Sequence, residues 1–173
     1  MDIVELRAKL KDWDLPMGPF RSIEEVYREM EVETHKLGPS AAAELAKALV
    51  KLEVEDDPLL ESLDEFLEIY SRHYPDALGE ALLLELRPTG SPSLVRLLGC
   101  TGSAKAVTQL KKVLALNEAS DDLLEALAGA LGDLGGAEAL EMLNSLQKRE
   151  NLSKQVQDEI NIALSKIARR RAS

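Results

Sequence analysis

The sequence has few of the residues on which several classes of protein depend. Only 3% of its 173 residues are aromatic, and it has one cysteine and two histidines. A single cysteine cannot form a disulfide within the chain, so the fold does not depend on an oxidising compartment. No apolar run approaches the roughly 20 residues that a membrane-spanning helix needs. The first 14 residues carry four acids rather than the apolar core of a signal peptide. We therefore expect a cytoplasmic protein with no membrane association.

The residues that are abundant favour helices. Apolar residues make up 45% of the chain and charged residues 30%, which is ordinary for a folded protein. Val, Ile, Thr and aromatic residues, which favour strands, are sparse, so Leu and Ala must fill the core. A chain of 173 residues is long enough to bury one sizeable core. The composition predicts an all-α fold class and a single domain over residues 1–173.

The charge is unevenly distributed along the chain. Residues 1–90 hold 10 Lys and Arg against 21 Asp and Glu, a net charge of −11, whereas residues 91–173 hold 11 against 10 and carry +1. An acidic surface repels nucleic acid and anionic lipid, and it speeds the encounter with a basic partner. We therefore expect no nucleic acid among the partners, and a basic protein is the partner that the charge favours. The same acids would also keep a small protein soluble without any partner.

Capping and breaking signals divide the chain into ten expected helices. Ser22 is followed three residues later by Glu25, which is a capping box. Other helix starts are marked by Ser40, Ser91, Ser103, Ser120 and Ser153. Prolines and glycines stop one helix before the next begins. The expected helices cover residues 2–13, 22–37, 41–52, 58–74, 77–86, 91–99, 104–116, 120–134, 137–149 and 153 to the arginines near the C-terminus.

The C-terminal half, residues 91–173, repeats with a period of 33 residues. The small and apolar residues Gly99, Gly102, Ala104, Ala106 and Leu110 recur as Gly132, Gly135, Ala137, Ala139 and Leu143. Three further columns stay mostly apolar over three copies: Leu94, Leu127 and Ile160; Leu98, Leu131 and Leu164; Thr101, Leu134 and Ile167. Repetition in this size range is typical of stacked helical arrays. We expect the glycines to serve the turns, because a residue after a helix end often needs a left-handed conformation.

Two stretches of this half resemble a known repeat. Ala130-Leu-Gly-Asp-Leu-Gly-Gly-Ala-Glu-Ala-Leu140 is similar to the HEAT-like repeat of the type named after phycobilisome lyases, in which a first helix ends in Ala-Leu-Gly and Ala- and Leu-rich positions start the second. Residues 98–107 are similar, and the resemblance covers residues 91–168. The family's arginine after the first apolar position of the first helix is replaced by Leu124 and Gln157. An arginine ladder is therefore not expected, and Leu124 would instead face another helix.

The resemblance implies a right-handed α-solenoid of antiparallel helix pairs, a HEAT/armadillo-like superhelix. In such a superhelix the second helices line the concave side, and the stack is used for protein binding. Residues 91–173 would be HEAT-like repeats, residues 38–90 diverged repeats of the same array and residues 1–37 capping helices. A cap is needed because two and a half repeats are fewer than the roughly three that burial usually requires.

Few residues are suited to chemistry, and each has a structural explanation. His35 and His73 are in no metal-binding spacing with Cys100 or with each other, and His73 suits a helix C-terminus. Cys100 has no histidine nearby in sequence to activate it, so we expect an inert thiol. Residues 99–105 superficially resemble a phosphate-binding loop, but they lack its spacing and follow no strand. The arginines 169–171 are favourable at a helix C-terminus without any ligand. We predict no catalytic, metal or cofactor site and no cofactor.

The resulting hypothesis is a non-catalytic protein–protein interaction scaffold or adaptor, either a monomer or a homodimer. If the second helices line the concave face, the residues between their buried columns bind the partner. These residues are Lys105, Thr108, Lys112, Glu138, Glu141 and Ser145.

Two other functions stay open. An acidic inhibitor, such as an immunity protein that neutralises a basic toxin, would bind its partner less tightly as salt is added. The acids it would use are Glu53, Glu55, Asp56, Asp57 and Glu61. A lyase-type enzyme or chromophore-handling protein is implied only by the name of the repeat, because the sequence offers no acid, base or cofactor constellation.

Overall fold

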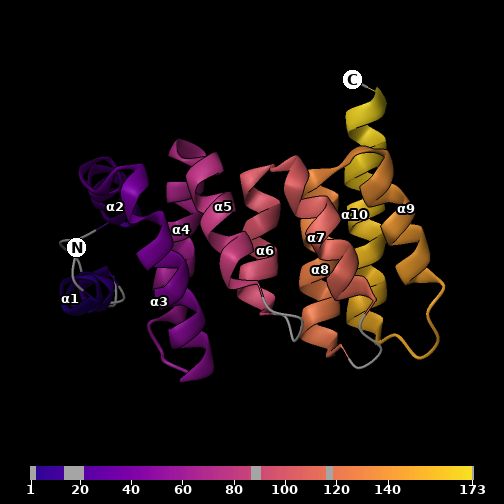
Figure 1. The fold of residues 1–173 in the computed structure, drawn as a ribbon, viewed down its shortest axis with the longest axis horizontal. Helices are drawn as coiled ribbons and strands as arrows, with labels where there is room; N and C mark the ends of the chain where they lie inside the picture. The colour runs from indigo at the N-terminus through magenta and orange to yellow at the C-terminus, as the bar shows by residue number, and fades with distance from the viewer. Residues whose placement is uncertain (1–2, 14–21, 87–90, 116–118, 173) are drawn as a thin grey trace.

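The computed structural model describes residues 3–13, 22–86, 91–115 and 119–172. These residues form ten α-helices and one short 3-10 helix, with no strand among them, so the prediction of an all-α fold class is confirmed. Figure 1 shows the helices side by side along the longest axis, from α1 and α2 at one end to α9 and α10 at the other. The elements are α1 (Ile3–Trp13), α2 (Ile23–Leu37), η1 (Pro39–Ala41), α3 (Ala42–Val54), α4 (Leu60–His73), α5 (Pro75–Glu85), α6 (Pro92–Thr101), α7 (Ala104–Leu114), α8 (Asp121–Leu134), α9 (Gly136–Gln147) and α10 (Lys154–Ala172).

Serine side chains cap four of the described α-helices, as predicted. The Ser22 side chain accepts a hydrogen bond from the Glu25 N–H, and the Glu25 carboxylate accepts one from the Ser22 N–H at 2.8 Å. The side chains of Ser91, Ser120 and Ser153 cap α6, α8 and α10 in the same way. The prediction for Ser40 is wrong, because Pro39–Ala41 form the 3-10 helix η1 and α3 follows with no side-chain cap. The expected start at Asp2 and the expected end at Leu116 lie outside the described residues.

The contacts arrange most of the helices in two rows. One row runs α2, α4, α6, α8 and α10, and the other runs α3, α5, α7 and α9, with each helix contacting the next in its row. Contacts within the first row are by far the most extensive where α8 packs against α6 and α10. The buried apolar side chains form one cluster that extends from Leu6 in α1 to Ile167 in α10. Leu124 is part of this cluster, as expected for a residue that faces another helix.

Two of the repeated glycines explain why the first row packs so closely. A Cβ atom at Gly99 of α6 would lie 2.6 Å from the Ala130 Cα of α8, and one at Gly132 of α8 would lie 2.8 Å from the Ala163 Cα of α10. Both contacts pair a glycine with an alanine 31 residues further on, so the same approach is made in successive repeats. The expectation that the repeated glycines serve turns is wrong for Gly99 and Gly132, which lie inside helices.

The turns are made by the neighbouring glycines. Gly102, Gly135 and Gly136 have φ values of 65°, 68° and 85°, in the left-handed region that glycine adopts without steric cost. Gly102 follows α6, and Gly135 lies between α8 and α9. The turn prediction is therefore confirmed for the second glycine of each repeated pair.

The N-terminal helices pack on α4. Trp13 of α1 stacks on Phe66 with ring centroids 5.2 Å apart, and both side chains are buried. The Tyr70 hydroxyl donates a 2.6 Å hydrogen bond to the Gly38 carbonyl, which joins the end of α2 to α4. These contacts tie α1 and α2 to the end of the helical rows.

Candidate functional site

An open groove of about 620 Å³ runs across the first row of helices. Its walls come from α4, α6, α8 and α10, so residues that are distant in sequence meet along it. The lining residues are Glu68, Pro92, Ser93, Arg96, Cys100, Asp122, Glu125, Ala126, Gly129, Asp133, Glu159 and Lys166.

Positions that line the groove recur every 33 residues, but the residue types at these positions differ from one repeat to the next. One column across the three helices reads Ser93, Ala126 and Glu159, and another reads Cys100, Asp133 and Lys166. Each column contributes one residue per repeat, and the side chain in it differs in polarity or charge from one repeat to the next. The buried columns of the same helices stay apolar, so packing sets the stack and these changing columns set the surface of the groove.

At the α4 end, an arginine bridges two acids. The Arg96 guanidinium of α6 forms ion pairs with Asp64 and Glu68 of α4. Asp64 is largely buried, and its Oδ1 atom has no hydrogen-bond partner in the described part of the chain. Burial raises the pKa of Asp64, although Arg96 opposes this by favouring the charged form. Arg96 is thus held by structural partners and adds little free positive charge to the groove.

At the α10 end, basic residues are also paired. Lys166 lies 3.2 Å from the Asp133 carboxylate, and the Arg170 Nη2 atom lies 3.9 Å from the same group. The Arg170 Nη1 atom also donates hydrogen bonds to the carbonyls of Gly132 and Asp133, at 3.2 and 2.5 Å. These carbonyls belong to the last turn of α8, where a cation is favourable.

Between these ends, the groove carries acids without a basic partner. Within the described part of the chain, Asp122, Glu125 and Glu159 take part in no ion pair. Burial raises the pKa of Glu159, Lys166 lowers it, and the charges of Glu125 and Asp133 raise it further. A Cβ at Gly129 would lie 3.2 Å from the Glu159 Oε1 atom, so this carboxylate lies over the backbone of α8. The middle of the groove is therefore a region of negative potential above a floor of small residues.

Cys100 lines the groove but is not an activated nucleophile. Desolvation by the groove wall and the charge of Glu68 raise the pKa of its thiol, while Arg96 opposes them. The residue as a whole still reaches solvent. A thiol with a raised pKa is mostly protonated at neutral pH and reacts slowly.

The six residues predicted to bind a partner lie on α7 and α9 and are all exposed. Lys105 pairs with Glu80 of α5 at 3.2 Å, and the Ser145 hydroxyl donates a 2.9 Å hydrogen bond to the Glu141 carbonyl. None of the six lines the groove. The repeat also carries a signal for the groove, because exposed columns of the first helices change chemistry from one repeat to the next.

The acids proposed for an inhibitor are largely engaged in contacts within the chain. Arg7 of α1 pairs with Glu55 at 3.0 Å and with Asp57 at 2.9 Å. The Glu53 carboxylate accepts a 3.1 Å hydrogen bond from the Ser93 N–H. These bonds join the end of α3 to α6 and the loop after α3 to α1, so much of the negative charge there has a structural role.

Among the described residues, no group of three or more His, Cys, Asp and Glu residues is arranged to hold a metal ion. No described helix is both long enough and apolar enough to cross a bilayer. Comparison of the chain with family models, curated proteins and solved structures finds no match.

Proposed function

We propose that this protein is a non-catalytic scaffold that binds another protein in the groove across α4, α6, α8 and α10. The observation that carries the proposal is the groove itself, an open hollow of about 620 Å³ that spans successive repeats. Its lining changes chemistry at every repeat while the core beneath it does not. A surface of this kind can encode specificity without disturbing the stack.

The proposal includes a HEAT-like superhelix, with the first helices on its inner curve. In support, α6, α8 and α10 approach each other at glycine–alanine contacts, whereas α7 and α9 contact each other less. Closer spacing in one row than in the other bends a stack toward the closely spaced row. This would place the groove on the concave side, where the sequence had suggested the second helices.

The partner that suits this groove presents a basic segment. Among the described residues, Asp122, Glu125 and Glu159 take part in no ion pair, and an opposite charge from a partner would stabilise them. The small residues Ala126 and Gly129 leave room for the backbone of a bound segment. The groove offers no histidine, and its single thiol has a raised pKa, which favours binding over catalysis.

Cys100 provides a direct test because it is the only cysteine and it lines the groove. A photocrosslinker on Cys100 should capture a partner from the native cell extract. The control carries the same label on α9, in a Cys100→Ser, Ser145→Cys variant, and should not capture that protein. Equal capture from both positions would contradict the assignment of the groove.

The captured protein is then purified and its affinity measured with paired charge reversals. Glu125→Lys with Glu159→Lys should weaken binding at least about tenfold, since like charges would then face each other. Glu138→Lys with Glu141→Lys on α9 makes the same change in net charge and should have little effect. A larger loss from the α9 pair would instead favour the second-helix surface predicted from the sequence.

An acidic inhibitor of a basic protein is the second candidate, and the net charge of −10 favours it. The captured partner distinguishes the two functions. An inhibitor should abolish an enzymatic activity of its partner and bind it with a steep dependence on salt. A scaffold should leave the activity of the bound protein in place.

A further inference from the structure

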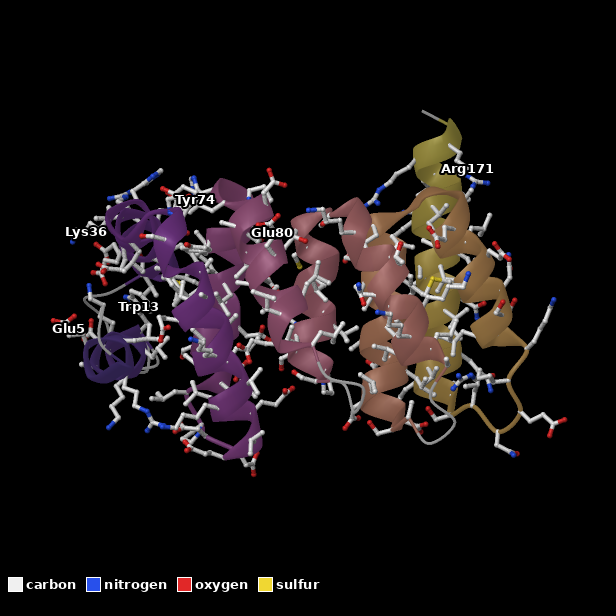
Figure 2. The ribbon with its side chains drawn as sticks, viewed as in Figure 1. Glu5, Trp13, Lys36, Tyr74, Glu80 and Arg171 are labelled. Carbon is white, nitrogen blue, oxygen red and sulfur yellow. The ribbon has the colours of Figure 1, made fainter. Side chains whose placement is uncertain are left out.

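The only two histidines of the chain meet at the N-terminal end of the molecule, far from each other in sequence. His35 lies in the last turn of α2, and His73 is the last residue of α4. Their ring centroids are 4.5 Å apart with an angle of 66° between the ring planes. Both residues are exposed, so the apolar core does not hold the rings together. Figure 2 shows their sequence neighbours Lys36 and Tyr74 on the same side of this end of the molecule.

We propose that His35 and His73 together bind a divalent transition-metal ion, with Cu²⁺ or Ni²⁺ preferred. Neutral imidazole is a good ligand for these ions, and two imidazoles on separate helices form a chelate that one alone cannot. The sequence spacing of the two residues does not predict such a site. The packing of α2 on α4 creates it.

The distance between the rings suits a particular coordination geometry. With each nitrogen about 2.1 Å from the ion, a ring centre lies about 3.2 Å from it. Two ligands at a right angle then have their ring centres about 4.5 Å apart, whereas a tetrahedral angle requires about 5.2 Å. The observed 4.5 Å corresponds to adjacent positions in the tetragonal geometry of Cu²⁺ and Ni²⁺. Because both residues are exposed, their rings can turn about χ2 to direct their nitrogens toward a shared ion.

The surroundings are mixed in charge. The pair lies where α2 and α4 both end, and the carbonyls of a helix C-terminus favour a cation. Lys36 and Arg72 are next to the two histidines in sequence and oppose a cation, but adjacent helical residues point about 100° apart. Within the described residues no third His, Cys, Asp or Glu joins the pair. Water would therefore complete the coordination, and the affinity would be that of a two-ligand site.

A bound ion would link α2 to α4 and so fasten the N-terminal helices to the rows. The folded protein would then unfold at a temperature that rises with metal concentration, since the ion binds the native pair and not the separated residues of the unfolded chain. This effect does not depend on the groove or on any partner.

The test uses untagged full-length protein with Cys100→Ser, because an exposed thiol also binds soft metals. The chloride salts of Cu²⁺, Ni²⁺, Zn²⁺ and Mg²⁺ are each titrated while binding heat and unfolding temperature are recorded. We expect one Cu²⁺ per chain and a rise in unfolding temperature that follows the order Cu²⁺, Ni²⁺, then Zn²⁺. Mg²⁺, which prefers oxygen ligands, should have no effect.

Two substitutions separate ligation from ring packing. His73→Phe keeps an aromatic ring against His35 but removes a ligand, and His35→Gln removes the other ligand. Each should leave the metal-free unfolding temperature nearly unchanged and lower the Cu²⁺ affinity at least about tenfold, because even the loss of a supporting residue around a metal ligand costs 10–100-fold. A Cys100→Ser protein that does not respond to Cu²⁺, or a response that survives when His73→Phe is added to it, would overturn the proposal.

Discussion

Gly132→Ala should destabilise the protein, although alanine normally stabilises a helix. In an exposed helix interior this change gains about 1 kcal/mol from helix propensity alone. At Gly132 the new Cβ would lie 2.8 Å from both the Cα and the Cβ of Ala163 on α10. These atoms belong to a helix backbone and cannot rotate away, so α8 and α10 would have to separate.

A second glycine in the same helix provides the control. At Gly129 the only atoms near a new Cβ belong to the Glu159 side chain, with Oε1 at 3.2 Å, and that side chain can turn away. The propensity gain is the same in both variants and cancels in their difference. What remains is the overpacking cost at Gly132, which is about 1–3 kcal/mol. Gly129→Ala should therefore be neutral or stabilising, and Gly132→Ala should be the less stable of the two.

Thermal unfolding followed by circular dichroism measures this difference. A difference of about 2.5 kcal/mol corresponds to about 5–10 °C for a chain of this size. Gly99→Ala tests the same contact one repeat earlier and should behave like Gly132→Ala, because its Cβ would lie 2.6 Å from the Ala130 Cα. If Gly132→Ala unfolds at the same temperature as Gly129→Ala or higher, close packing of the first helices is not the reason for the repeated glycine.

Three further predictions concern the groove. Arg96→Ala leaves Asp64 buried without its cation and should lower the free energy of unfolding, measured with urea, by about 1–3 kcal/mol. This is less than for a fully buried pair, because the arginine side chain is 40% exposed. An equal loss in an Asp64→Asn background would contradict the ion pair. Burial raises the pKa of Asp64, and a carboxyl with a raised folded pKa contributes stability that is present below its unfolded pKa near 3.8 and is lost as the pH rises through the folded value. The wild type should therefore lose stability relative to Asp64→Asn as the pH rises above the unfolded value, and a difference that grows in favour of the wild type would refute this. Cys100 should react with iodoacetamide at pH 7 more slowly than an unstructured cysteine peptide, and Glu68→Gln should speed the reaction because Glu68 raises the pKa of the thiol; a rate equal to that of the peptide would show that the thiol is not perturbed.

Local signals in the sequence were sufficient to predict where most of the helices lie. Serine caps and an abundance of Leu and Ala act within a few residues, so the starts at Ser22, Ser91, Ser120 and Ser153 could be predicted without knowledge of the fold. The failure at Ser40 has a local cause as well. Pro39 suits the first turn of a 3-10 helix, so the chain enters η1 before α3 begins.

The candidate site could be predicted only in part. In residues 91–168 the 33-residue register predicted which helix positions are buried and which are exposed, and the six predicted residues on α7 and α9 are indeed exposed. It could not show which row of helices would be hollowed. That depends on how closely neighbouring helices approach, and a glycine for a turn looks the same in sequence as a glycine for a close contact.

The sequence by itself determined the elements: an all-helical chain, its caps, and the apolar columns that any packing of these helices must bury. The tertiary structure decided which exposed residues share a surface. It brought Glu159 over Gly129, bridged Asp64 and Glu68 with Arg96, and placed His35 beside His73. The physical reason is range, because capping and periodicity act within a few turns of one helix, whereas a groove or a ligand pair is created by helices that meet only after the chain has folded.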